Sequence, residues 1–369
     1  MQLNKLSVNY FKNYEEEEIE FSERVNVFTG SNGVGKTNLL DAVYYLSFTK
    51  SYFNSIDSQN INHNSDYFMI KGVYKNSFDG TDTVSCAVKR NERKHFKLNG
   101  KEYGRMANHI GVFPLVIISP HDSNMIYGGS EERRKYIDGV ISQFDKAYLD
   151  ILLDYNKVLN QRNAFLKYLA ENRSADSSQL DIWDEKMAFL GEEIHRKRKE
   201  FLDEFIPVVR EFYSFISQDK EITGIDYRSH LNDGDFRELL KESRGRDMML
   251  RHSSTGVHRD DTVFTINGYP LRKFGSQGQQ KSFLVALKLA QFDYTKNKKG
   301  FKPLLLLDDV FDKLDIYRVE QMMKLVSRNE FGQIFITDTN RSRIERVFEG
   351  IEVKPRIFEI ESGKVVRDE

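Results

Sequence analysis

The pattern of apolar and polar residues divides the chain into three parts. In the first 120 residues, short stretches rich in β-formers alternate with turn residues such as Gly80 and Gly100, which predicts strands. The expected strands cover residues 3–8, 17–21, 25–28, 69–74, 84–89 and 95–98. Residues 37–48 have apolar side chains three and four positions apart, and they are therefore predicted to form a helix.

The middle third has a helical period. Apolar residues recur every three or four positions from Phe144 to Leu169 and again from Leu180 to Phe212, and the polar residues 172–179 separate the two runs. This pattern predicts two amphipathic helices that form an antiparallel arm, with the apolar stripe packed between them. Each helix would be roughly 45 Å long, too short for a chromosome-spanning coiled coil.

After about residue 250, strands and helices alternate again. We expect strands at 263–266, 304–307 and 334–337, helices at 281–291 and 319–326, and a final hairpin from 356–360 and 364–366. The predicted fold class is α/β. The expected division is an N-terminal part at 1–125, a helical insertion at 126–250 and a C-terminal part at 251–369.

Composition narrows the possible functions. The chain has 369 residues, and 55 Lys and Arg against 56 Asp and Glu leave a net charge of -1. Any nucleic-acid surface must therefore be a local patch. The single cysteine, Cys86, cannot form an intrachain disulfide, and the histidines lack the spacing of a zinc site. No apolar run approaches the ~20 residues of a membrane span, and the first residues lack a signal-peptide core. We therefore expect a cytoplasmic protein without membrane contact.

The strongest motif fits the phosphate-binding loop (P-loop) pattern G-x-x-x-x-G-K-[ST]. It consists of Gly30, Ser31, Asn32, Gly33, Val34, Gly35, Lys36 and Thr37. The glycines let backbone N–H groups approach phosphates, and the helix that follows adds its positive end. Lys36 is expected to neutralise the β- and γ-phosphates, and the Thr37 hydroxyl to ligate Mg²⁺. Asn38, the next residue, completes the predicted nucleotide-binding segment.

A P-loop needs a further carboxylate for its metal. The apolar run 304–307 predicts a buried strand, and Asp308 and Asp309 follow at its carboxyl end, where open α/β sheets bind ligands. We expect Asp308 to hold Mg²⁺, directly or through water, and Asp309 to orient or deprotonate the attacking water. Aspartate is one methylene shorter than glutamate, so its carboxylate lies farther from the γ-phosphate, which predicts slow hydrolysis.

The segment 274–282 separates this chain from other P-loop proteins. The guanine motif N-K-x-D of GTPases is absent from the sequence, whereas Ser276, Gly278 and Gln279 align with the L-S-G-G-Q signature of ABC-type ATPases. A serine at a helix N-terminus makes a second anion site. A polar helix cap accounts for the serine but not for the neighbouring Gly and Gln. In this superfamily the signature faces the γ-phosphate bound by the other subunit, which implies a head-to-tail dimer.

Together these motifs resemble the bacterial RecF family, small SMC-like relatives of the ABC ATPases. The matching segments are 13–14, 29–45, 119–122, 133–138, 256–261, 275–280 and 305–315. Leu314 and Asp315 resemble the D-loop. Asp338 stands where ABC transporters carry a switch histidine, Val257 where the family usually has proline, and Phe53 where an arginine is common.

The resemblance implies both a fold and a function. The fold would be an ABC-type P-loop ATPase head, a mixed sheet plus an N-terminal antiparallel β part, with an inserted helical arm. The protein would be a weak DNA-dependent ATPase that uses ATP and Mg²⁺. Its ATP-driven homodimer would clamp double-stranded DNA near single-strand gaps and ss/ds junctions. With RecO and RecR it would help RecA replace single-strand binding protein.

The sequence supports DNA contacts only through basic clusters. The candidates are Arg133, Arg134, Arg196, Lys197 and Arg198. Each cluster alone is more typical of a solvated helix face, but such residues can pool in a dimer to contact phosphates. Alternative functions are an SMC-like structural tether, the ATPase subunit of a nuclease complex, and a transporter ATPase. The short arm argues against the tether, the 60 residues after the acidic pair are too few for a nuclease domain, and the N-terminal match argues against a transporter ATPase.

Overall fold

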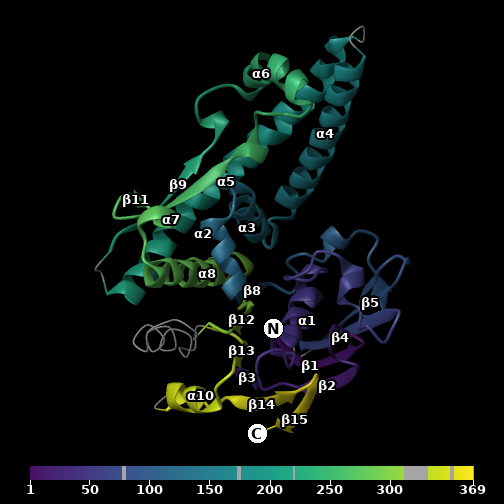
Figure 1. Cartoon of the computed structure of the whole chain (residues 1–369), viewed down its shortest axis with the longest axis vertical. Helices are drawn as coiled ribbons and strands as arrows, with labels where there is room; N and C mark the ends of the chain where they lie inside the picture. Colours follow the sequence, from purple (N-terminus) through teal and green to yellow (C-terminus); the bar gives the residue numbers. More distant parts are fainter. Residues whose placement is uncertain (77–79, 173–175, 219–220, 311–330, 350–352, 369) are drawn as a thin grey trace. The chain divides into compact units, whose positions relative to one another are not determined.

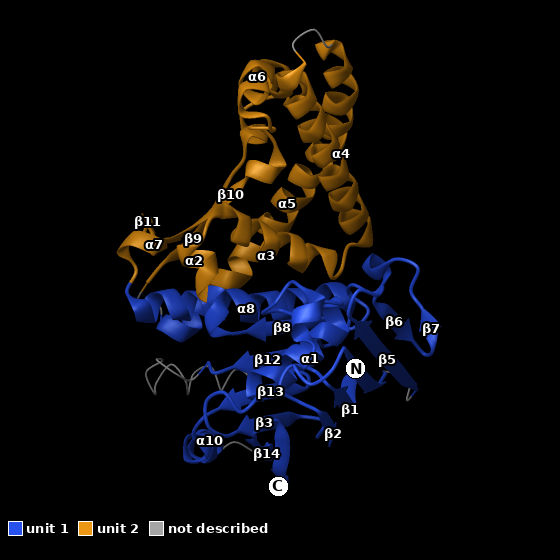
Figure 2. Ribbon diagram, turned by 45° about the vertical axis from the view of Figure 1, so that its right-hand side comes forward, with its two compact units in different colours: residues 1–122, 212–219, 276–369 blue, residues 123–211, 220–275 orange. Residues whose placement is uncertain are grey.

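The computed structural model describes residues 1–76, 80–172, 176–218, 221–310, 331–349 and 353–368. Contacts divide it into two compact units, coloured separately in Figure 2. Unit 1 comprises residues 1–122, 212–219 and 276–369, and unit 2 comprises 123–211 and 220–275. This division assigns residues 251–275 to unit 2, whereas the sequence analysis placed a boundary at 250; the expected domain limits stay a prediction.

A six-stranded mixed sheet organises unit 1 (Figure 1). Its order is β15 (Lys364–Asp368), β14 (Arg356–Glu361), β3 (Val25–Thr29), β13 (Ile334–Asp338), β12 (Leu304–Asp308) and β8 (Leu115–Ile118). All neighbours pair in parallel except β14 and β15, which form the expected hairpin. Strands β3, β8, β12 and β13 are buried along their whole length, as parallel strands covered on both faces must be.

A second sheet in unit 1 is antiparallel, with the order β2-β1-β4-β5-β6-β7. Its strands are β1 (Gln2–Asn9), β2 (Glu16–Glu20), β4 (Tyr67–Lys75), β5 (Thr81–Lys89), β6 (His95–Leu98) and β7 (Lys101–Glu102). Burial alternates along β4 and β5, so one face of this sheet packs on the core while the other meets solvent.

Helix α1 (Lys36–Phe48) lies between the two sheets, because it contacts β4 and β5 on one side and β8, β12 and β13 on the other. Its side chains are buried almost all round, as a helix enclosed on every side requires. The core cluster correspondingly joins side chains from α1 and both sheets. Two further helices, α8 (Gln277–Lys299) and α10 (Arg341–Phe348), complete the described part of unit 1.

Unit 2 contains the helical arm. Helices α3 (Ser130–Ser142), α4 (Lys146–Glu171), α5 (Leu180–Ser217) and α6 (Phe236–Leu250) accompany the short α2 (Asn124–Tyr127) and α7 (Leu271–Phe274). The last turn and a half of α5 belong to unit 1. A small sheet is formed by β9 (Thr223–Arg228), β10 (Asp261–Ile266) and β11 (Tyr269–Pro270).

Short 3-10 helices complete the assignment. They are η1 (Asp57–Asn60), η2 (Met106–Asn108), η3 (Pro120–Ser123), η4 (Ser177–Gln179), η5 (His230–Asn232) and η6 (Val257–Arg259).

Most predicted elements are present with shifted ends, and the α/β fold class is confirmed. The two predicted arm helices correspond to α4 and α5. The pattern did not predict β8, β9, α3 or α6. The predicted helix 319–326 and the D-loop segment at Leu314 and Asp315 lie outside the described residues. Within the described ranges, none of the helices has both the length and the apolar composition that crossing a bilayer requires.

Candidate functional site

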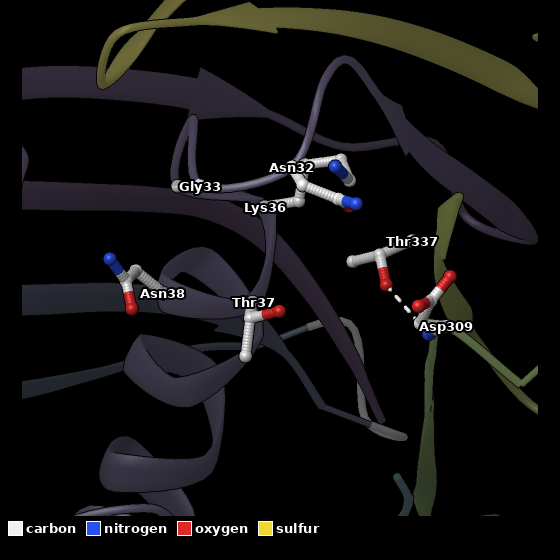
Figure 3. A pocket seen from close by; sticks show the side chains of 8 residues that line it. Asn32, Gly33, Lys36, Thr37, Asn38, Asp309 and Thr337 are labelled. Atoms are coloured by element: carbon white, nitrogen blue, oxygen red, sulfur yellow. Dashed lines mark hydrogen bonds between the residues drawn. The ribbon is translucent and has the colours of Figure 1, made fainter. Parts of the chain in front are cut away.

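Strand order creates a pocket at one edge of the mixed sheet. Because β3, β13 and β12 are parallel neighbours, their carboxyl ends meet at the same edge. The pocket there is lined by Asn32, Gly33, Gly35, Lys36, Thr37, Asn38, Asp309 and Thr337. Figure 3 shows the P-loop residues on one side of it and Thr337 and Asp309 on the other.

The P-loop is held in shape from outside. The Val34 carbonyl accepts hydrogen bonds from Asn13 Nδ2 at 2.8 Å and from the Gly363 N–H at 2.9 Å. With this carbonyl fixed outward, the loop can turn N–H groups toward a ligand. Gly30 has φ 145°, and a Cβ there would lie 2.4 Å from the Ile360 carbonyl oxygen, so only glycine fits.

Lys36 is anchored by the loop it belongs to. Its Nζ donates to the carbonyl oxygens of Gly30 and Ser31, each at 2.7 Å. Burial lowers the pKa of Lys36, while the carboxylates of Asp309 and Asp308 oppose this shift. An ammonium has three N–H donors. The described residues accept two of them, so the third can donate to a ligand oxygen. Lys36 also begins α1, whose first N–H groups lack partners within the helix.

Two threonine hydroxyls hold the acidic pair, one from the P-loop and one from β13. Asp308 Oδ1 accepts from Thr37 Oγ1 at 2.9 Å and from Thr337 Oγ1 at 2.8 Å. The Asp309 N–H in turn donates to Thr337 Oγ1 at 2.9 Å (Figure 3). Thr337 lies on β13, the strand between β3 and β12, and its hydroxyl contacts both residues of the acidic pair. The sequence analysis assigned it no role.

The donor set at Thr37 and Asp308 fits Mg²⁺. A hydroxyl and a carboxylate oxygen are hard oxygen ligands, and Mg²⁺ in nucleotide sites takes one or two protein ligands, with phosphates and water supplying the rest. Burial raises the pKa of Asp308, and the threonine hydrogen bonds counteract this shift. The two hydroxyls that orient the carboxylate are thus also groups that oppose its protonation.

Asp338 is the last residue of β13, at the position where ABC transporters carry a switch histidine. Its side chain is fully buried and accepts from Arg343 Nε at 3.0 Å and Nη2 at 2.8 Å. The carboxylate therefore fixes the start of α10.

The signature segment lies outside this pocket. Ser276 caps α8: its Oγ accepts from the Gln279 N–H at 3.2 Å, while Gln279 Oε1 accepts from the Ser276 N–H at 2.6 Å. This capping box accounts for Gln279 as well as the serine, so the expectation that a cap explains only Ser276 was wrong. Neither they nor Gly278 line the pocket. The three lie at an accessible helix N-terminus, and their nucleotide role stays a prediction.

Two of the five predicted DNA contacts are buried in unit 2, which corrects that prediction for them. Arg198 is 2% exposed and pairs with Asp138 at 3.0 Å and Asp260 at 2.8 Å. Arg133 is 9% exposed and pairs with Asp261 at 2.7 Å. A buried guanidinium that already satisfies carboxylates joins helices and strands within the unit and is not available to DNA phosphates.

The other three basic residues are more accessible. Arg134 is half-buried and donates to the Asp260 carbonyl oxygen at 2.6 Å, and Lys197 pairs with Asp145. Arg196 is exposed and pairs with two residues of its own helix, Glu193 and Glu200. Exposed pairs of this kind contribute little to stability and exchange easily for another anion. Arg196 is therefore the candidate that the geometry leaves most accessible to DNA.

What separates this pocket from other P-loop sites is α8, whose N-terminus carries the Ser-x-Gly-Gln segment in the same unit. With that helix, the mixed sheet and the antiparallel sheet around α1, the fold is that of an ABC-type ATPase head with an added helical arm.

Comparison with known proteins narrows this class to one family. The model of the RecF/RecN/SMC N terminal domain matches residues 2–361. A protein of Phocaeicola vulgatus named DNA replication and repair protein RecF is 50% identical over 366 residues, which are 99% of this chain and 98% of that protein. The protein of the same name from Flavobacterium johnsoniae is 46% identical, over 98% of this chain and 100% of its own.

Solved structures support the same family assignment. The recombination mediator protein RecF with ATP, of the RecFOR pathway, matches with a TM-score of 0.89 at 32% identity, over 100% of this chain and 97% of that one. The SMC head domain of Pyrococcus furiosus shares the fold, with a TM-score of 0.58 at 16% identity, over 99% of this chain and 96% of that one. The chain belongs to the RecF family, and the resemblance predicted from its sequence is confirmed.

Proposed function

We propose that this chain is an ATP-dependent DNA-binding protein of recombinational repair and replication-fork maintenance, with a weak ATPase activity that resets it. The observation that carries the proposal is the convergence of Lys36, Thr37, Asp308 and Asp309 on one sheet edge while Ser276 stays outside the pocket. The relatives named DNA replication and repair protein RecF, and the structure of RecF with ATP, support the same function.

The pocket residues divide the work on ATP. The P-loop N–H groups and the remaining Lys36 donor bind the β- and γ-phosphates, which is also where the start of α1 favours negative charge. Thr37 and Asp308 would hold Mg²⁺, which would neutralise phosphate charge. Asp309 accepts a proton from the attacking water. Because its side chain is short, hydrolysis is slow, and the protein works as a timed switch more than as a motor.

A second copy of the chain completes each site. The accessible N-terminus of α8 offers the Ser276 hydroxyl and the positive end of the helix to the γ-phosphate held by the partner. A ligand at 100 times its dissociation constant stabilises the state it prefers by about 2.7 kcal/mol. Two shared ATP molecules therefore favour the dimer by roughly 5 kcal/mol, a factor on the order of 10⁴. ATP thus converts a weak homodimer into a closed one.

The output of the closed dimer is DNA binding and recruitment. We infer contacts with the backbone of duplex DNA near single-strand gaps, because backbone contacts need only pooled lysines and arginines. The solved relative is assigned to the RecFOR pathway. By that likeness we propose RecR and RecO as partners, RecA loading as the result, and the cytoplasm, where the chromosome lies, as the location.

A mixing experiment tests the shared site. Lys36→Met removes the phosphate ligand, whereas Ser276→Asp keeps a good N-cap but places a negative charge against the phosphate. Each variant alone should lose ATP turnover and ATP-dependent dimers. In a mixed dimer one site contains both mutations and the other contains neither, so mixing should restore turnover. No gain on mixing, or full activity of the folded Ser276→Asp variant, would refute the shared site.

A further inference from the structure

A chain of buried polar contacts begins on α1, one turn beyond the P-loop. Asp41 follows Thr37 by one helical turn and is fully buried. Its Oδ1 accepts the Tyr52 N–H at 2.7 Å. Its Oδ2 accepts from Ser51 Oγ and pairs with Lys12 Nζ, both at 2.6 Å. The carboxylate therefore fixes the segment after α1 to the helix that carries the nucleotide ligands.

The chain of contacts continues from Tyr52 to the signature helix. The Tyr52 hydroxyl donates to Asp122 Oδ1 at 2.6 Å, and the same oxygen pairs with Lys288 Nζ at 2.7 Å. The other oxygen, Asp122 Oδ2, accepts the Ser119 N–H at 2.8 Å. The side chains of Lys288 and Asp122 are 6% and 2% exposed. Lys288 lies on α8, twelve residues after Ser276, and all these residues belong to unit 1.

Stability alone does not account for the buried ion pair of Lys288 and Asp122. Removing two charges from water costs about as much as their attraction returns, and apolar side chains of equal volume stabilise a core as well or better. A buried pair has, however, only one good geometry, because a small displacement leaves both charges unpaired. The contacts of Asp122 with Tyr52 and Lys288 therefore specify one position of α8 against α1.

We propose that Lys288, acting through Asp122 and Tyr52, is a positioning residue that keeps the signature end of α8 in a fixed register with the P-loop helix. The two helices carry the two halves of the phosphate chemistry: α1 serves the nucleotide of its own chain, and α8 serves that of a second copy. The link makes the position of one depend on the other. This proposal rests on the shared site of the proposed function and adds the residues that align its halves.

Three variants separate this role from a merely structural one. Tyr52→Phe removes a single hydroxyl and keeps the ring, and Lys288→Met removes the charge while keeping chain length. Lys296→Met is the matched control, because Lys296 is on the same helix but pairs with its helix neighbour Asp293 near the surface. Each protein is examined for urea unfolding, for binding of a fluorescent ATP analogue at concentrations where it is monomeric, and for ATP-dependent dimerisation by sedimentation.

The expected result is a split between the two binding measurements. Tyr52→Phe and Lys288→Met should bind the analogue within about twofold of the parent but form ATP-dependent dimers at least tenfold more weakly, and turn over ATP correspondingly slowly. Lys296→Met should match the parent in both. The Tyr52→Phe variant decides the matter if Lys288→Met does not fold.

Three outcomes would overturn the link, and the third would also refute the shared site. Unchanged dimerisation of folded Tyr52→Phe shows that the contacts do not position α8. An equal loss of monomeric nucleotide binding and dimerisation shows general damage to the fold. If the parent binds the analogue but shows no ATP-dependent dimer, the shared site itself is wrong, and the link built on it falls with it.

Discussion

Thr337 offers a direct test of how the acidic pair is held. Its hydroxyl donates to Asp308 Oδ1 at 2.8 Å and accepts the Asp309 N–H at 2.9 Å. Thr337→Val keeps the shape of the side chain and removes both hydrogen bonds, while Thr337→Ser keeps the hydroxyl. Thr337 is buried, so water does not replace the lost hydroxyl.

The expected magnitude follows from these contacts. A hydrogen bond to a charged group contributes about 1.5–3 kcal/mol, and an unsatisfied buried N–H costs about 1–3 kcal/mol. Because part of the second cost is relieved at the half-buried Asp309, we expect a net loss of roughly 2–4 kcal/mol of unfolding free energy. The Asp308 pKa, already raised by burial, should rise further, because one of the two threonine hydrogen bonds that oppose this shift is lost.

The raised pKa of Asp308 determines how the stability of the fold depends on pH. A carboxyl whose folded pKa lies above its unfolded value binds more protons when folded, so its stabilising contribution is present at low pH and is lost as pH rises through the folded pKa. With Asp308 as the proposed Mg²⁺ ligand, binding of Mg²⁺ and ATP needs the ionised carboxylate, so the pH midpoint of nucleotide binding should move upward in Thr337→Val.

Two assays check both consequences. Urea unfolding measures the loss of stability, and titration with a fluorescent ATP analogue in Mg²⁺ across pH measures the midpoint. Thr337→Ser should resemble the parent in both. If Thr337→Val unfolds at the parent's urea midpoint and binds nucleotide with the parent's pH profile, the hydroxyl does not hold the acidic pair and the reasoning fails.

Three other predictions concern the loop, the arm and acid stability. Gly30→Ala should weaken ATP binding more than tenfold in a titration, because its Cβ would lie 2.4 Å from a carbonyl oxygen at φ 145°. Arg198→Met should cost about 3–5 kcal/mol in urea unfolding by leaving Asp138 and Asp260 unpaired. The salt dependence of DNA binding should not change in a variant that still folds. Burial lowers the pKa of His109 and His258 to about 4, so the unfolded chain binds more protons between pH 4 and 6.5 and stability falls as pH drops. At pH 5 each histidine should lower the free energy of unfolding by about 2 kcal/mol. Glutamine at either position should make that free energy depend less steeply on pH in an acid titration.

The linear motifs of the site could be predicted from the sequence, but their connections could not. The P-loop is one continuous segment, and the apolar run before Asp308 is a clear buried strand. Thr337 was missed because its role depends on strand order: only the crossover that places β13 between β3 and β12 brings it to Asp308. Asn13 and Gly363 were missed for the same reason, since they reach Val34 from opposite ends of the chain.

Arg198 shows a signal that the sequence did contain. The basic run 195–199 is typical of a solvated helix face. However, Arg198 follows Ile194 by four positions and precedes Phe201 and Phe205 by three and seven, so it lies in phase with the buried stripe of α5. Arg162 is in the same situation on α4, where it is fully buried and pairs with two aspartates. A charged residue in an apolar phase predicts a buried ion pair better than a DNA contact.

The backbone at residue 309 bears on why an aspartate stands where many ABC ATPases have glutamate. Asp309 has φ 49°, in the left-handed region, with its N–H held by Thr337. Aspartate and asparagine adopt this region most readily among residues with a side chain, and other side chains pay roughly 1–2 kcal/mol. A glutamate would reach farther toward the attacking water but would destabilise the turn that sets Asp308 against Thr37. In the proposed function, the acidic pair therefore favours a well-placed metal ligand at Asp308 over a longer base at residue 309, and this choice is the physical reason for which we propose slow hydrolysis.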